Sequence, residues 1–398
     1  METLNGVNAL TIVFAALCIF AIAYRFYGLW IAQKVLNINA ARETPAVRFD
    51  DGKDYVPTNK YVLFGHHFAA IAAAGPLLGP VLAAQFGYLP GLLWILIGCV
   101  LAGGVHDMVV LFCSVRHRGN SLAYIASQEI DSTTGRVAAW AVLAILILTL
   151  AGLSIAVVNA MHNSLWSTYT VAATIPIAIL MGLYMQVWRK GDVSGATIMG
   201  VVLLFLCILS GPWVASHPEY FGFLDIDKPE MSLLIPIYGF FASVLPVWLL
   251  LLPRDYLSTF LKIGTIGALA IGIAFVMPNF NMPPLTEFIH GGGPIIGGPV
   301  IPFLFITIAC GALSGFHATI GTGTTPKMIG NEKDVLFVGY GAMLMEGFVA
   351  IMALVAACGP DRCAGTHVNA VGSQRDQRSG RQVRQARHVR RRTPAARG

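Results

Sequence analysis

Long apolar runs alternate with short polar connections along the first 358 residues of this chain. A run of about 20 apolar residues is long enough for a helix to cross the hydrocarbon core of a membrane. A soluble helix instead carries polar residues on the face that meets water. The pattern therefore predicts an all-α membrane protein with about ten spans, over residues 7–23, 61–86, 92–114, 137–160, 169–187, 195–214, 232–252, 263–277, 300–320 and 335–357.

The basic residues of the connections are sorted by side. With the N-terminus outside, fifteen of the sixteen Lys and Arg residues up to position 358 fall in inner connections, and Lys228 alone falls in an outer one. Basic loops stay on the cytoplasmic side, so the sorting predicts a multi-pass protein with an outer N-terminus. Ala21-Ile22-Ala23 has the form of a signal cleavage site. The n-region, however, contains Glu2 and no Lys or Arg, which favours a true first span.

The composition supports the same class. Charged residues make up 12% of the chain and hydrophobic residues 56%, against about 25% charged in soluble domains. The seven Cys form no C-x-x-C pair, so we interpret them as small hydrophobic residues rather than as disulfide or metal positions. The Gly-rich run at 321–325 lacks the G-x-x-x-x-G-K-[ST] order of a phosphate-binding loop, which argues against nucleotide binding.

Residues 359–398 differ in kind from the rest of the chain. They contain ten Arg, no Lys and two acidic residues, whereas residues 1–358 contain sixteen basic and eighteen acidic residues. After ten spans this tail would lie outside, against the charge rule. We therefore divide the chain into a transmembrane domain, 1–358, and an Arg-rich disordered tail, 359–398, which a shifted reading frame would explain. The alternative is a genuine basic tail for anionic lipid or nucleic acid.

Proline and glycine interrupt two of the predicted spans. Gly75-Pro76 and Gly79-Pro80 lie in the middle of the second span, and Pro236 and Pro246 lie in the seventh. Each proline removes a backbone donor, and interrupted helix in a membrane belongs beside a cavity or other helices. Two broken spans, five apart and opposite in direction, predict an incomplete five-plus-five inverted repeat with substrate at the breaks. Packing kinks are the alternative interpretation. The candidate substrate-binding residues are Gly75, Pro76, Gly79, Pro80, Tyr238 and Pro246.

Other polar residues within the spans are candidates for coupling to an ion, either a proton or Na⁺. Ionisable residues inside a membrane are costly and often functional, although Asp107 and Glu346 could equally be structural partners of a nearby Arg or His. His66 and His67 cannot face one direction, so one is expected at a pathway and the other at the interface. Arg254-Asp255 is interpreted as an ion pair at the inner surface. The candidate coupling residues are Ser314, His317, Thr324, Thr325, Asp107 and Glu346.

Three long segments resemble the carbon starvation protein A family: FGHHFAAIAAAGPLLGPVLAAQFGYLPG (64–91), LPVWLLLLPRDYLSTFLKIGT (245–265) and FLFITIACGALSGFHATIGTGTTPKM (303–328). The similarity runs from about Asn8 to Cys358, after which family members continue with further spans. The resemblance implies a bacterial inner-membrane transporter linked to nutrient limitation and to peptide uptake. Relatives in the family import pyruvate with protons. It also implies a relation to the amino acid–polyamine–organocation transporters.

We therefore expect proton-coupled import of a peptide or of pyruvate, with membrane lipid as surroundings, no nucleic acid partner and no catalytic residues. A channel, a membrane-embedded enzyme using His66, His67 and His317, and a non-functional fragment are the alternatives. No H-E-x-x-H motif or nucleophile elbow supports an enzyme. The oligomeric state is not predicted.

Overall fold

The computed structural model describes residues 7–189, 191–280 and 282–359, and over these residues the protein is built from helices without a β-strand. The predicted all-α membrane fold is confirmed. Seven helices are long and apolar enough to cross a membrane: Ala9–Val35, Tyr88–Arg116, Ser132–Met161, Leu165–Trp188, Val193–Ala215, Leu251–Val276 and Leu336–Cys358. An eighth candidate span consists of α3 (Lys60–Ile71) and the segment Gly75–Phe86, bent by 45°.

The predicted number of ten spans is not confirmed. The predicted seventh span corresponds to α12 (Lys228–Val244), which has 17 residues. The ninth is divided into two short helices, α14 (Val300–Thr307) and α15 (Gly315–Gly321), with non-helical backbone between them. The tail predicted at 359–398 lies outside the described residues except for Gly359.

The inner connection predicted around Arg254 and Lys262 is wrong. Helix α13 (Leu251–Val276) runs through both residues without interruption. Pro253 lies in its first turn, where a proline costs no helical hydrogen bond. The charges of this segment are accommodated inside the bundle by contacts with α3, described below. The turn between α12 and α13 consists instead of residues 245–250 and contains Pro246.

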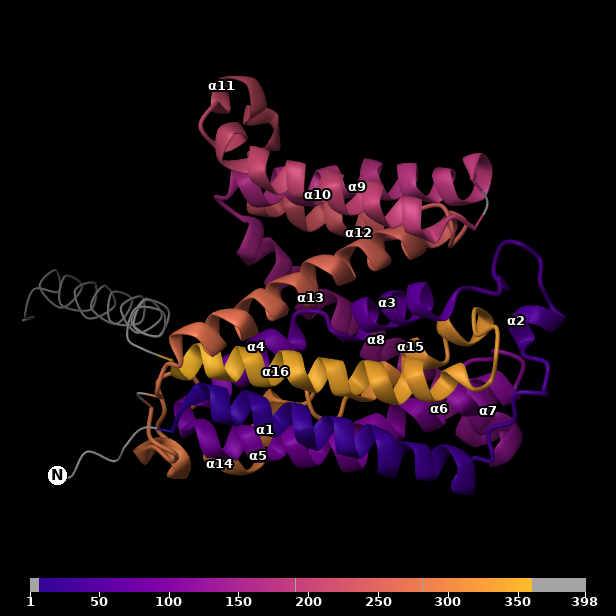
Figure 1. Ribbon diagram of the computed structural model, residues 1–398, viewed down its shortest axis with the longest axis horizontal. Helices are drawn as coiled ribbons and strands as arrows, with labels where there is room; N and C mark the ends of the chain where they lie inside the picture. Colours follow the sequence, from indigo (N-terminus) through magenta and orange to yellow (C-terminus); the bar gives the residue numbers. More distant parts are fainter. Residues whose placement is uncertain (1–6, 190, 281, 360–398) are drawn as a thin grey trace, which may run out of the picture.

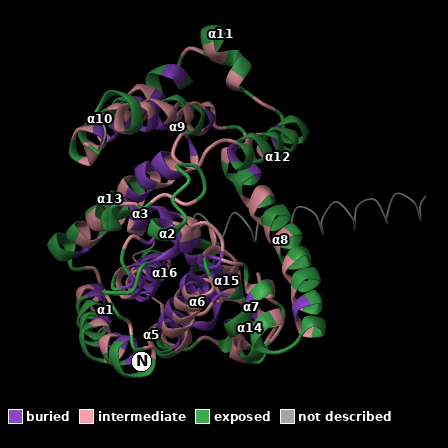
Figure 2. Ribbon diagram, turned by 90° about the vertical axis from the view of Figure 1, so that its right-hand side faces the viewer, coloured by how far each residue is buried: buried purple, intermediate pink, exposed green. Residues whose placement is uncertain are grey.

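Helix α16 (Ala342–Cys358) lies at the centre of the molecule (Figure 1). Within the span that contains it, 78% of the most apolar window is buried, against 6% for α8 (Ser132–Met161). Figure 2 shows the same contrast, with buried helices around α16 and a largely exposed α8. An apolar helix so exposed fits lipid as its solvent rather than water. Packed around or near α16 are α1 (Ala9–Ile22), α3, α4 (Gly75–Ala83), α5 (Tyr88–Gly98), α6 (Gly104–Arg116) and α13.

In the predicted path of the chain through the membrane, inner connections lie at one end of the bundle and outer connections at the other. At one end the Tyr55 hydroxyl donates to the Arg118 carbonyl at 3.0 Å, and Thr58 pairs with Ile329. At the other end Asn8 pairs with Asn279. Three of the connections predicted to be inner thus share one end, where α2 (Pro45–Arg48) and α7 (Leu122–Glu129) lie in Figure 1.

Candidate functional site

The predicted break in the second span is confirmed, with residues 72–74 as its non-helical part. The Ala73 amide bonds the Ile71 carbonyl at 2.9 Å instead of the carbonyl four residues back. The released Ala69 carbonyl accepts a hydrogen bond from Lys262 Nζ at 2.8 Å. Since lipid offers no hydrogen bonds, a break in a span needs such partners from neighbouring helices. Lys262 of α13 supplies one.

Gly75 and Gly79 bring α4 against the backbone of the ninth predicted span. A Cβ added to Gly75 would lie 2.5 Å from Cys310 Cβ, and one added to Gly79 would lie 2.3 Å from the Thr307 carbonyl oxygen. Pro76 lies in the first turn of α4 and Pro80 inside it, both buried. These four candidate substrate residues therefore form the contact between two broken segments in this structure.

Tyr238 and Pro246 are not brought to this break. Tyr238 belongs to α12, which packs chiefly on α8, and Pro246 lies in the turn that follows. The interruption predicted at Pro236 is wrong, because α12 continues through that residue. The interruption predicted at Pro246 is present, but residues 245–250 there form the turn between α12 and α13. The second span broken within itself is the ninth. Residues 308–314 separate α14 from α15, and Ser314, with extended backbone, precedes the first turn of α15.

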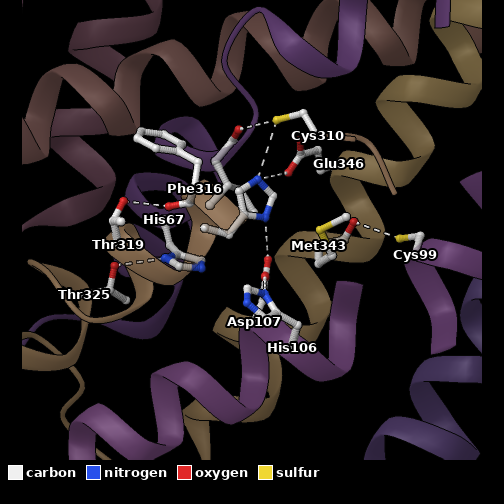
Figure 3. A network of polar contacts seen from close by, with 12 residues as sticks. His67, Cys99, His106, Asp107, Cys310, Phe316, Thr319, Thr325, Met343 and Glu346 are labelled. Atoms are coloured by element: carbon white, nitrogen blue, oxygen red, sulfur yellow. Dashed lines mark hydrogen bonds and ion pairs between the residues drawn. The ribbon is translucent and has the colours of Figure 1, made fainter. Parts of the chain in front are cut away.

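The break in the ninth span places His317 between two buried carboxylates, Asp107 and Glu346. Figure 3 labels both carboxylates, and dashed lines mark their contacts with the imidazole between them. His317 Nδ1 lies 2.8 Å from Asp107 Oδ2 on α6, and Nε2 lies 3.3 Å from Glu346 Oε2 on α16. The Cys310 thiol lies 3.7 Å from the same Nε2. Relative exposures are 2% for Asp107, 1% for His317 and 0% for Glu346. We call Asp107, Cys310, His317 and Glu346 the His317 cluster.

The two carboxylates are held differently. Asp107 contacts a second imidazole, since His106 Nδ1 lies 2.9 Å from its Oδ1. Among the described residues neither oxygen of Glu346 has a hydrogen-bond partner, and His317 is its ion-pair contact. An imidazole donates from both nitrogens only when it is protonated. Facing a carboxylate on each side, His317 can therefore hold or release a proton between α6 and α16.

The two adjacent histidines of α3 extend this polar region in different directions. His67 Nδ1 lies 2.9 Å from Thr325 Oγ1, and His66 Nδ1 lies 3.0 Å from Asp255 Oδ2 on α13. The expectation that they face apart is confirmed. Placing one at the interface is wrong, since exposures are 3% for His66 and 1% for His67. Both are buried because α13 and the segment after α15 cover α3.

Helix α13 contributes a row of polar contacts along α3. Besides Lys262, Thr259 donates from Oγ1 to the Gly65 carbonyl at 2.6 Å. The predicted ion pair between Arg254 and Asp255 is wrong: the Arg254 guanidinium lies over the Tyr238 ring, 4.9 Å from its centroid, while Asp255 faces His66. The pattern of apolar runs does not predict this row, because it places these residues in a connection between two spans.

The coupling candidates are brought together only in part. Thr325 is fully buried and contacts His67, whereas Thr324 has a half-buried side chain just before it. Ser314 is buried one turn before His317. Cys310, interpreted from sequence as a small hydrophobic residue, is the member of the His317 cluster that was missed. The feature of the sequence that could have identified Cys310 is its position seven residues before His317.

Ligand-type atoms of three residues of the cluster lie close enough to share one small cation. One atom each from Cys310, His317 and Glu346 falls within 4.8 Å of the others. The same spacing suits residues that share protons. The arrangement is therefore compatible with a small cation and with shared protons, and does not choose between them.

Comparisons with known proteins identify the family to which the chain is related. Residues 8–390 match the profile of the family described as carbon starvation protein CstA. The chain is 57% identical over 352 residues to the peptide transporter CstA of Escherichia coli K12, covering 88% of this chain and 50% of that protein. It is 53% identical over 350 residues to the peptide transporter CstA of Bacillus subtilis 168, covering 88% and 58% respectively.

A third relative has a different name. The pyruvate/proton symporter BtsT of Escherichia coli K12 is 53% identical over 351 residues, 88% of this chain and 49% of that protein. The chain thus spans about half the length of these curated relatives. No solved structure matches it. With a family profile that covers most of its length and a buried ionisable cluster between two broken spans, the chain belongs to the carbon starvation protein CstA family.

Proposed function

We propose that this chain provides helices of a secondary active transporter of the bacterial cytoplasmic membrane. The substrate is a peptide or a small carboxylate such as pyruvate, and uptake is coupled to protons. Two relatives with closely similar sequences carry these names, peptide transporter and pyruvate/proton symporter. Because the chain covers about half of those proteins, the activity is proposed for the protein of which these helices are a part.

The observation that carries the proposal is the His317 cluster between two broken spans. Three ionisable side chains, one each from α6, α15 and α16, are buried together with a thiol. They lie among helices that are long and apolar enough to span a membrane. Charged groups there are retained chiefly for ion pathways and proton relays. Substrate and ion sites formed where transmembrane helices are interrupted are typical of secondary transporters.

We assign proton coupling to Asp107, His317 and Glu346. A proton moving between the two carboxylates through the imidazole would link α6 to α16, and α15 carries the imidazole between them. Thr325, Thr324 and Ser314 provide hydroxyl groups close to this path, which would serve Na⁺ if that were the coupling ion. Protons are favoured because the thiol and imidazole are poor ligands for Na⁺.

We place the substrate at the break of the second span. Gly75, Pro76, Gly79 and Pro80 form the start of α4, and the positive end of a helix dipole favours a carboxylate there. In this structure residues 307–310 cover these glycines. Substrate entry therefore requires α4 and the ninth span to separate, which is the type of movement that alternates access. Tyr238 and Pro246 would affect the substrate only indirectly, through Arg254 and α13.

Uptake into proteoliposomes tests the proposal. The protein, reconstituted together with the rest of its natural chain, is given labelled pyruvate or a labelled dipeptide with and without an inward proton gradient. Accumulation above equilibrium that an uncoupler abolishes supports a proton symporter. Equilibration without accumulation would identify a channel, chemical conversion an enzyme, and no uptake a non-transporting fragment. A requirement for Na⁺, or loss of uptake with a chelator, would assign a different coupling ion.

A further inference from the structure

A second polar site lies at the end of the bundle where the predicted inner connections meet, away from the His317 cluster. It is a pocket of about 390 Å³. A water molecule takes roughly 30 Å³ of liquid, so the pocket has room for a small anion with part of its hydration shell. Its walls come from three separate parts of the chain: Arg42, Glu43, Thr44, Pro45, Arg48, Phe49, Val115, Arg116, Arg118 and Glu332.

The three parts are tied together by their own contacts. Thr44, 1% exposed, is directed at the Gly330 carbonyl, with its Oγ1 at 3.5 Å. The Asn39 amide donates to Glu332 Oε2 at 3.0 Å. Arg118 has a left-handed backbone with φ of 61°, and its carbonyl accepts from the Tyr55 hydroxyl. The pocket is therefore built by tertiary structure and is more than a set of neighbouring surface loops.

The pocket holds an excess of unpaired positive charge. Glu332 is fully buried, and its carboxylate is bonded by Arg116 Nε and by the Asn39 amide. These contacts leave three guanidinium groups in the pocket lining against one further carboxylate, that of Glu43. Within the described residues, no acidic group lies within 4.0 Å of any of the three, which are Arg42, Arg48 and Arg118.

The choice of basic residue is informative. Lys53, Lys327 and Lys333 belong to the same end of the bundle, yet the pocket is lined by four arginines and by no lysine. A general preference for positive charge at the inner surface would be satisfied by either residue. Arginine differs in presenting a planar fork of donors that matches the oxygens of a phosphate group bidentately.

We propose that this pocket binds a phosphate-bearing anion. The phosphate can belong to an anionic lipid, because the site lies where a membrane surface is expected, or to a soluble phosphorylated metabolite. In both cases its oxygens would bridge the segment at 42–48 to the end of α6. Occupancy would therefore stabilise this end of the bundle, independently of whatever the His317 cluster transports.

The test measures binding and thermal stability on the full chain purified in a neutral detergent. Inorganic phosphate is titrated against chloride at equal ionic strength, which removes general screening. Phosphate is expected to raise the melting temperature. Arg48→Gln and Arg118→Gln should each weaken the apparent phosphate affinity about 10- to 100-fold, since hydrogen bonds to charged groups are worth about 1.5–3 kcal/mol. Both side chains are exposed, but only Arg118 has a left-handed backbone, so the replacement of Arg48 is expected to fold even if that of Arg118 does not.

Lys53→Gln is the matched control. It removes one positive charge from the same connection but not from the pocket. The turn around Lys53 is held by its backbone amide, which donates to Asp51 Oδ1 at 2.9 Å. Its phosphate affinity should stay at the wild-type value. Equal weakening by Lys53→Gln and Arg48→Gln would overturn the proposal, because it would indicate unspecific attraction.

A second experiment, in lipid vesicles, distinguishes the phosphate of a lipid headgroup from that of a soluble metabolite. The chain is reconstituted in phosphatidylcholine vesicles with or without phosphatidylglycerol, and its melting temperature is measured again. Stabilisation by phosphatidylglycerol that Arg48→Gln removes and Lys53→Gln retains indicates a lipid headgroup. Stabilisation by inorganic phosphate alone indicates a soluble ligand. No Arg48-dependent effect in either arm would overturn the proposal.

Discussion

Asp107 and Glu346 face the same imidazole, yet the protein satisfies them unequally. Asp107 contacts His317 and His106, whereas neither oxygen of Glu346 has a hydrogen-bond partner among the described residues. A buried carboxylate without donors is unfavourable for folding. We therefore infer that Asp107 contributes to stability as well as to coupling, and that Glu346 is retained for coupling. The sequence leaves open whether each carboxylate carries a proton or is a structural partner. By this inference Asp107 has both roles, whereas Glu346 has the proton role.

Asp107→Asn is expected to abolish proton-driven accumulation and also to destabilise the protein. The amide would place N–H groups against an imidazole nitrogen, and each lost hydrogen bond to a charged group costs about 1.5–3 kcal/mol. Uptake in proteoliposomes and unfolding in detergent measure the two effects. Glu129→Gln is the matched control, because Glu129 pairs with His117 at 2.8 Å but is 63% exposed. Coupled uptake that persists in Asp107→Asn would contradict the proton role.

Glu346→Gln is expected to affect proton-driven accumulation more than it affects the stability of the protein. Since no hydrogen bond to Glu346 is found within the described part of the chain, whereas Asp107 contacts two imidazoles, Glu346→Gln should cost less stability than Asp107→Asn. Accumulation driven by a pH gradient should be lost, while exchange of substrate at equal pH continues. A large loss of stability with normal coupling would show that Glu346 is a structural partner.

At the scale of elements, proline position predicted one break correctly and another wrongly. In the second span the helix is interrupted just before Gly75-Pro76, where Lys262 is available to the released carbonyl. In α12 the helix continues through Pro236, and a proline inside a membrane helix is tolerated when the freed backbone groups find other partners. The break at 308–314 contains no proline. This break lies against α4 and α16, where Gly75 and Gly79 approach residues 307–310 and Gly311 approaches Ala350. Such tertiary contacts cannot be read from the local sequence.

The contact between the two broken segments leads to a prediction on stability. Gly79→Ala should destabilise the protein by about 1–3 kcal/mol, because its Cβ would meet the Thr307 carbonyl oxygen at 2.3 Å and backbone must move. The denaturant midpoint measures this cost. Gly264→Ala on α13 is the control, where a Cβ meets nothing within 4 Å and alanine should stabilise the helix by up to about 1 kcal/mol. Equal effects at both positions would show that the approach at Gly79 is looser than described.

For the whole molecule, the sorting of Lys and Arg among the connections predicts the arrangement of the chain better than the number of apolar runs does. It grouped the connections that contact each other at one end of the bundle, such as those containing Tyr55, Arg118 and Lys327. It misplaced Arg254 and Lys262 because a charged residue inside α13 looks the same in sequence as one in a loop. Only the contacts with His66, Tyr238 and Ala69 show that these charges lie within the bundle, and such contacts depend on the tertiary fold.

The threading itself predicts that Lys53 and Asp225 lie on opposite sides of the membrane. Lys53 belongs to the connection that contacts Arg118 and Lys327, and Asp225 to the acidic connection between α10 (Val193–Ala215) and α12. Single cysteines at 53 and 225 should react with an impermeant maleimide from the inside and the outside respectively. The unsubstituted chain controls for native thiols, of which Cys18 is exposed. Labelling of both positions from one compartment would contradict the threading, because an even number of spans would then separate them.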